Sequence, residues 1–104
     1  MEIRHVVMWR VAGATAAERS RNCRTVRDAF LGLRGRIPGL QELEVGIDTS
    51  RVDYACDVIL CTRFQDVQSL EDYAAHPEHL RVKRELGDVR VSRHQVDYPV
   101  TASQ

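Results

Sequence analysis

Two imidazoles and a phenol lie within a segment of seven residues, at Tyr73, His76 and His79. An ordinary imidazole has a pKa of about 6.5 and exchanges protons near neutral pH. A phenol can donate a hydrogen bond to a developing oxyanion or orient an imidazole. Together with His5, such groups could remove a proton next to a carbonyl group and stabilise the enolate. We therefore take His5, Tyr73 and His79 as candidate catalytic residues, and this chemistry needs no cofactor.

Each of these residues also has a purely structural interpretation. His5 can pack on an apolar strand face and bond to a backbone carbonyl, and Tyr73 can bury its ring while its hydroxyl stays wet. His76 precedes Pro77, which favours a helix-cap or hinge role. Three imidazoles also raise the alternative of a zinc site. Because His76 and His79 straddle the expected kink, and no acidic or thiol ligand is obvious, we expect no metal.

His5 belongs to an alternating segment, residues 2–11, that predicts a β-strand. One face of this strand carries Ile3, His5, Val7, Trp9 and Val11, and the other carries Arg4, Val6, Met8 and Arg10. Apolar side chains on both faces indicate a strand that is covered on both sides. We expect helices to cover the face with His5 and a partner subunit to cover the other.

Two helical regions are expected to complete the site. Thr15 and Glu18 fit a capping box at the start of the first helix, which we expect to end at Gly35 and Pro38. Its buried stripe would consist of Cys23, Val26, Phe30 and Leu33.

The second helical region is expected to begin with a cap at Ser69 and Asp72, to kink at Pro77 and to end at Gly87. This places Tyr73 before the kink and His79 after it. Further strands are expected at residues 40–48, 54–64 and 89–98.

The resulting order is β-α-β-β-α-β, which predicts an α+β, ferredoxin-like domain with an antiparallel four-stranded sheet and helices on one face. We expect the domain to span residues 1–98 and a C-terminal tail to span 99–104. The second face of the sheet would expose Val6 and Met8. A second copy of the chain would cover this face, so we expect a homodimer.

Composition excludes several other classes of protein. Lys and Arg together number 15, as do Asp and Glu, so the formal net charge is zero. A neutral chain of this kind does not favour a nucleic-acid or membrane partner. The cysteines, Cys23, Cys56 and Cys61, follow no zinc or redox spacing, and we expect all of them to be reduced. If residues 55–64 form one strand, Cys56 and Cys61 point to opposite faces and do not pair. No signal-peptide pattern is visible, and we expect a cytoplasmic protein.

Three segments resemble the stress-responsive dimeric α/β-barrel family: IRHVVMWRV from Ile3, DYAAHPEHLRV from Asp72 and VDYP from Val96. The resemblance extends from about Ile3 to Pro99. It implies a ferredoxin-like subunit, a homodimer whose two sheets face each other as a barrel, and a pocket between each sheet and its helices.

One plant branch of this family is a cofactor-free polyketide (olivetolic acid) cyclase that works by intramolecular aldol chemistry. By this resemblance His79 would be the base, while Tyr73 and His5 would orient or polarise the substrate. His76 and Pro77 would be structural.

Three functional hypotheses follow. The first is a cofactor-independent, polyketide cyclase-like lyase, or a binder of small aromatic or polyketide-like ligands, that uses His5, Tyr73 and His79. The second is a non-catalytic stress-response dimeric module. The third is a cofactor-free monooxygenase.

Overall fold

Alternating side chains place the first strand at the centre of the sheet in the computed structural model, which describes residues 1–101. Strand β1 spans Ile3–Trp9, and every second residue of it, His5 included, is buried. Its neighbours are β3, Val58–Phe64, and β4, His94–Pro99, while β2, Leu40–Ile47, pairs with the outer edge of β3. All neighbouring strands are antiparallel, in the order β2-β3-β1-β4. The expected four-stranded antiparallel sheet is confirmed for the part of the chain that is described.

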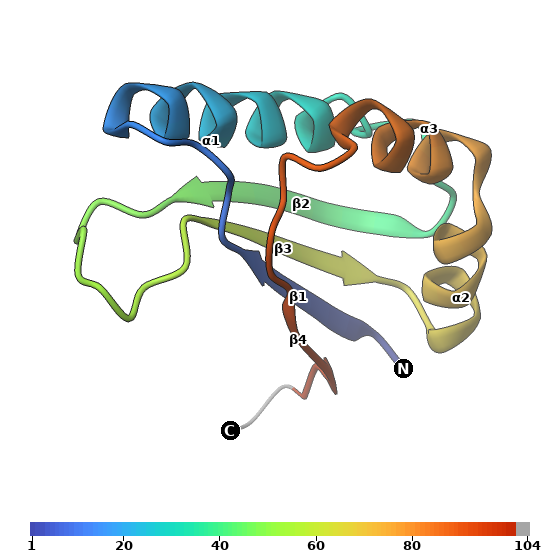
Figure 1. The fold of residues 1–104 in the computed structure, drawn as a ribbon. Coiled ribbons are helices and arrows are strands. Elements are labelled where there is room, and N and C mark those ends of the chain that lie inside the picture. The colour runs from blue at the N-terminus through green and yellow to red at the C-terminus, as the bar shows by residue number, and fades with distance from the viewer. Residues whose placement is uncertain (102–104) are drawn as a thin grey trace.

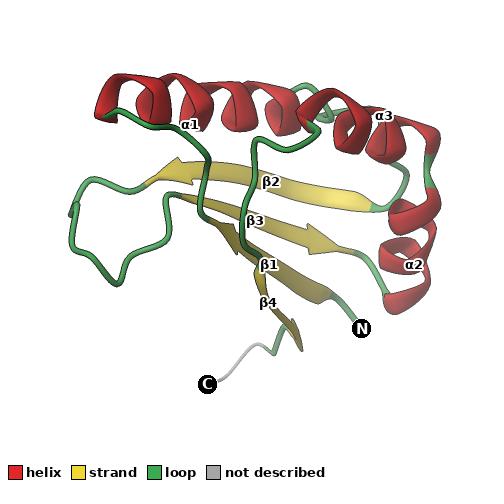
Figure 2. Cartoon of the chain, in the orientation of Figure 1, coloured by secondary structure: helices red, strands yellow, loops and turns green. Residues whose placement is uncertain are grey.

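Helices cover one face of this sheet, as expected for a ferredoxin-like fold. Helix α1, Ala16–Leu31, and helix α3, Pro77–Leu86, lie across that face, and α2, Val67–Ala75, stands at its end (Figure 1). Between the helices and the sheet lies a core that includes Val7, Trp9, Val26, Phe30, Leu60, Phe64 and Val82. No helix of residues 1–101 covers the opposite face of the sheet (Figure 2).

Local signals at the helix ends were partly correct. Thr15 caps α1 by accepting a hydrogen bond from the Glu18 N–H at 3.1 Å. The helix itself ends at Leu31 rather than at Gly35, and turns continue the chain from there to the buried Leu33. The expected cap at Ser69 is wrong, because Asp66 occupies the cap position and accepts from the Ser69 N–H at 2.8 Å. Helix α2 therefore starts at Val67.

All four strands are shorter than expected, and the difference is largest for β3 and β4. Residues 54–57 precede β3 as a loop, because the N–H and the carboxylate of Asp57 both form hydrogen bonds with the backbone at the end of β1. Its N–H donates to the Trp9 carbonyl, and its carboxylate accepts from the Val11 N–H, both at 2.8 Å. Cys56 therefore lies outside the strand, and the argument about opposite faces does not apply to it. All three cysteines are free thiols.

The last strand starts at His94, and before it the bridge between Val11 and Arg90 joins this segment to the sheet. Pro99 belongs to β4, and the Val100 N–H donates to the Glu2 carbonyl at 2.9 Å. Positions 102–104 of the expected tail lie outside the described residues. The division into a domain of 1–98 and a tail stays a prediction. No helix within residues 1–101 is long and apolar enough to span a bilayer.

Candidate functional site

A cavity of about 330 Å³ lies between the inner face of the sheet and helix α2. His5, Tyr73 and His79 all line it, although they come from β1, α2 and α3. Arg93, Gln95 and Asp97 line the β4 side, and the side chains of Val67 and Leu70 add apolar surface from α2. The structure therefore brings the three sequence-predicted residues together.

His5 is anchored by a carboxylate that sequence reasoning missed. Its side chain is 5% exposed, and Nδ1 lies 2.6 Å from Oδ1 of Asp97. The sheet register explains the contact, because His5 and Asp97 are direct partners across β1 and β4 and so share the inner face. Since a carboxylate only accepts, the His5 Nδ1 carries the proton and Nε2 is left for a bound molecule.

Asp97 is itself held in place by its own strand. Gln95 donates from Nε2 to Oδ2 of Asp97 at 3.0 Å, and the Arg93 guanidinium donates to Oε1 of Gln95. Gln95 and Asp97 alternate along β4 and Arg93 directly precedes that strand, so the three side chains point to the same face. Both oxygens of Asp97 are thereby engaged, and its orientation toward His5 is fixed. The spacing at positions 93, 95 and 97 was visible in the sequence, but its meaning depended on the register.

A sharp corner between α2 and α3 positions the other two residues. His76 is the C-cap of α2 and the N-cap of α3, and its Nδ1 accepts a hydrogen bond from the Glu78 N–H at 3.1 Å. Pro77 then occupies the first turn of α3, where its missing N–H costs no hydrogen bond. The predicted cap role of His76 is confirmed. Beyond the corner, the ring of His79 packs on that of Tyr73 with centroids 4.4 Å apart.

Tyr73 lies in the middle of the cluster. Its ring centroid is 6.2 Å from that of His5, and the two rings meet edge to face. Burial raises the pKa of the Tyr73 phenol to about 12, against smaller opposing effects of the cationic Arg93 and Arg90. The phenol therefore stays protonated at neutral pH and can act as a hydrogen-bond donor.

His79 has the properties of a base. Burial lowers its pKa below the ordinary value, which the hydrogen bond to the Ala74 carbonyl partly opposes. The positive charges of Lys83, Arg90 and Arg93 lower this pKa further. Nδ1 lies 3.2 Å from the Ala74 oxygen, so it donates there and leaves the Nε2 lone pair free. At neutral pH the imidazole is uncharged and able to accept a proton.

The remaining histidine, His94, is exposed on the outer face of β4, opposite Met8. Among residues 1–101, no group of three or more His, Cys, Asp or Glu side chains is arranged to hold a metal ion.

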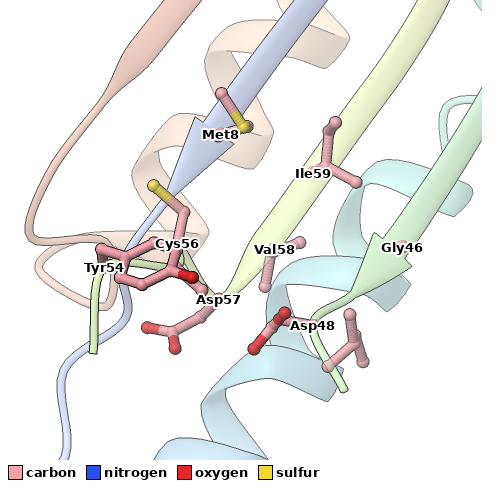
Figure 3. Close-up of a pocket in the computed structure, with 10 residues that line it drawn as sticks. Met8, Gly46, Asp48, Tyr54, Cys56, Asp57, Val58 and Ile59 are labelled. Atoms are coloured by element: carbon pink, nitrogen blue, oxygen red, sulfur yellow. The ribbon is translucent and has the colours of Figure 1, made fainter. Parts of the chain in front are cut away.

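A second hollow, of about 430 Å³, lies on the opposite side of the sheet. Met8, Gly46 and Ile59 form its floor, and Tyr54 and Cys56 of the loop before β3 form one wall (Figure 3). None of the sequence-predicted site residues reaches it. It continues the uncovered outer face, where Val6 pairs with Cys61 and Val96.

Comparisons with known proteins agree with this architecture. A family model described as Stress responsive A/B Barrel Domain matches residues 3–100. No curated protein matches the sequence significantly.

Solved structures with the same fold include several proteins of low sequence identity. One is a dimeric protein of unknown function with a ferredoxin-like fold from Bacteroides fragilis, with a TM-score of 0.83, 23% identity and coverage of 95% of this chain and 96% of that one. A hydroxynitrile lyase from Passiflora edulis has a TM-score of 0.78 and 16% identity over 99% of this chain and 96% of its own. A cofactor-independent oxygenase from Streptomyces nogalater has a TM-score of 0.63 and 19% identity over 99% and 98% of the two chains. At these identities the likeness establishes the fold.

Proposed function

Because this chain belongs to the stress responsive A/B barrel domain family, we propose that it is a small cofactor-independent acid–base enzyme of the polyketide-cyclase type. Its substrate would be a small aromatic or polyketide-like carbonyl compound bound between the sheet and α2. One observation carries the proposal: His5, Tyr73 and His79 line one cavity, and Nδ1 of both catalytic histidines is engaged by a protein oxygen. Each imidazole therefore offers Nε2 to the substrate.

The reaction begins with His79 as the base. Its Nε2 takes a proton from the carbon next to a substrate carbonyl, and the electron pair of that C–H bond moves into the enolate. The Tyr73 hydroxyl, protonated because of its raised pKa, donates a hydrogen bond to the enolate oxygen. The base and the oxyanion donor are thus neighbouring rings, with centroids 4.4 Å apart.

His5 acts on the second carbonyl. When Nε2 carries a proton, the Asp97 carboxylate at 2.6 Å stabilises the positive charge of the ring. The enolate carbon then forms a bond with the polarised carbonyl carbon of the same molecule, and the new alkoxide takes a proton from an imidazolium. One proton leaves the substrate and one returns, so the aldol step consumes no co-reactant.

The fold is compatible with catalysis. Two solved neighbours are named as a lyase and as a cofactor-independent oxygenase, which supports the idea that this architecture can hold a small enzyme without a cofactor. Because one neighbour is an oxygenase, a monooxygenase reaction is the competing enzymatic hypothesis. The third hypothesis is the non-catalytic module.

We further propose that the protein is a homodimer in which the outer faces of two sheets meet. Val6, Met8, Ile59 and Cys61 form an apolar strip on the two central strands, and no part of residues 1–101 covers it. Val96 extends the strip onto β4 and is 59% exposed. Uncovered apolar surface of this kind favours association. The Bacteroides fragilis neighbour is described as dimeric, which supports the proposal.

The decisive experiment uses a linear β-polyketone with a terminal carboxylate as the substrate and follows cyclisation by NMR, because the aldol product is an isomer of the substrate. We expect His79→Gln to lower turnover by about 100-fold, the smaller end of the contribution of a general base. His94→Gln, which removes an exposed histidine outside the cavity, is the matched control and should keep full turnover.

Full turnover in His79→Gln would overturn the assignment of the base. Oxygen uptake with a phenolic substrate, in place of cyclisation, would favour the monooxygenase. Absence of turnover, combined with imidazole NMR signals that ignore every candidate ligand, would favour the non-catalytic module.

A further inference from the structure

We propose that Arg90 and Arg93 form an anion-binding subsite beside His79, so that the substrate of this site carries a carboxylate. This inference rests on the proposed function and narrows its substrate class to small aromatic or polyketide-like carboxylic acids. It assigns a binding role to two residues that the catalytic scheme does not use.

Backbone pairing fixes Arg90 on the inner side of the sheet. Arg90 forms a bridge with Val11, between two hydrogen bonds: Ala12 N–H to the Val89 carbonyl at 2.7 Å and Val91 N–H to the Arg10 carbonyl at 2.9 Å. Because Val11 is buried against the helices, the opposing Arg90 is directed to the same face.

The guanidinium of Arg90 stacks on aromatic rings. Its central carbon lies 5.1 Å from the ring centroid of Trp9 and 5.6 Å from that of Phe30, and these two rings stack on each other at 4.9 Å. An aromatic ring packs against the flat face of a guanidinium, and the N–H groups at its edge can still donate hydrogen bonds. A planar carboxylate fits that edge as a bidentate partner.

Arg90 has no acidic partner within residues 1–101. Five other arginines, namely Arg4, Arg27, Arg36, Arg63 and Arg81, form ion pairs with carboxylates. Arg90 is half-buried and forms none. Burial and the nearby charge of Arg93 lower its pKa, which is the expected response of a cation that lacks a counter-charge. A bound anion would supply that charge.

Arg93 brings a second positive charge to the cavity wall. Its guanidinium donates to the neutral amide oxygen of Gln95 and to no carboxylate of the described chain. The carboxylates at the cavity belong to Asp97, which is engaged by His5 and Gln95, and to Glu71 on the α2 side. The free positive charge therefore lies on the β4 side of the cavity.

Arg93 lines the cavity together with His79, and Arg90 and Lys83 lie close enough for their charges to act on the His79 imidazole. These three charges are all positive, whereas the cavity's carboxylates belong to Asp97 and Glu71. A carboxylate would be drawn to this end of the cavity, and an enolate formed by His79 would be stabilised by the same field. A neutral substrate would gain only the stabilisation of its enolate and not the attraction of a carboxylate. The arrangement therefore favours an acid as the ligand.

The test compares two probes of nearly the same shape, the anionic 2,4-dihydroxybenzoate and the neutral 2,4-dihydroxybenzamide, by NMR titration at neutral pH. We expect the folded protein to bind the carboxylate about tenfold more tightly than the amide, which is the difference expected for one charge-assisted hydrogen bond. Arg90→Met, which keeps an apolar chain on the Trp9 ring, should remove this preference. Arg93→Met, at an exposed position, should reduce it, and Arg21→Met on the exposed face of α1 is the matched control that should keep it.

Equal binding of the two probes would overturn the anion subsite while leaving the cavity and its proposed chemistry intact. A preference for the carboxylate that survives in both Arg90→Met and Arg93→Met would overturn the assignment to these residues. Failure of both probes to bind would overturn the subsite together with its ligand class. The catalytic proposal fails independently, through full turnover in His79→Gln.

Discussion

Replacing Asp97 with Asn tests whether the contact of 2.6 Å with His5 controls the site. The substitution keeps the shape of the side chain but replaces one acceptor oxygen with a donor NH₂ group. If the amide oxygen faces His5, the NH₂ group faces the Gln95 Nε2 donor. Gln95 cannot turn to offer its own oxygen, because the Arg93 guanidinium holds that oxygen. If the amide is reversed, its NH₂ group faces Nδ1 of His5 and forces the ring proton to Nε2.

The first orientation loses the hydrogen bond with Gln95, and the second keeps both hydrogen bonds but moves the ring proton to Nε2. Both orientations lose the negative charge beside His5. A hydrogen bond to a charged group contributes roughly 1.5–3 kcal/mol. The Asp97 side chain is 35% exposed, so solvent weakens the interaction and the lower end, about 1.5 kcal/mol, applies. We therefore expect Asp97→Asn to lower turnover about tenfold.

The assay reads the position of the ring proton directly, from the ¹⁵N chemical shifts of the His5 imidazole. In the unsubstituted protein we expect the proton on Nδ1, and in Asp97→Asn a shift of population toward Nε2. Glu71→Gln is the matched control, because this carboxylate also lines the cavity but does not contact His5. An unchanged tautomer together with unchanged turnover in Asp97→Asn would refute the reasoning, as would an equal loss in Glu71→Gln.

Two further predictions concern the dimer and pH. Ile59→Lys places a charge on the apolar outer face and should convert the dimer to a monomer in light scattering, whereas Leu80→Lys on α3 should not; a monomeric unsubstituted protein would contradict the dimer. Burial lowers the pKa of His79 below 6.5, so the folded state favours the neutral ring. This contribution to stability is fully present above pH 6.5 and is lost as the pH falls through that value toward the lowered pKa. The free energy of unfolding, measured with a denaturant, should therefore fall less on acidification in His79→Gln than in the unsubstituted protein. Identical pH dependences would count against a buried, neutral His79.

Local patterns were sufficient for much of the fold. Alternation along Ile3–Trp9 placed His5 on the buried face, and the pair His76 and Pro77 marked the corner between α2 and α3. These features depend on backbone geometry within a few residues, which a sequence displays directly. The convergence of Tyr73 and His79 with His5 followed from them once helices were assigned to one face of the sheet.

Features that depend on contacts between distant parts of the chain, or on a choice between similar nearby residues, were less predictable. Asp66 and Ser69 both belong to residue types that cap helices, and only the structure shows Asp66 in that position. The apolar stretch before Val58 has the composition of a strand, but Asp57 donates a hydrogen bond to the Trp9 carbonyl and accepts one from the Val11 N–H, and these bonds hold the stretch as a loop. The partner of His5 could not be read from spacing, because Asp97 becomes its neighbour only through the register of β1 and β4.

The distance along the chain between His5 and Asp97 has a consequence for biosynthesis. These residues are 92 positions apart, and among the described residues β1 is the one strand that pairs with β4. A nascent chain that has released β1, β2, β3 and all three described helices can already form most of the core. It still presents β1 as an open edge and His5 without its carboxylate. The proposed acid–base site is therefore completed last, so an incomplete translation product would lack the carboxylate partner of His5 even where its core had formed.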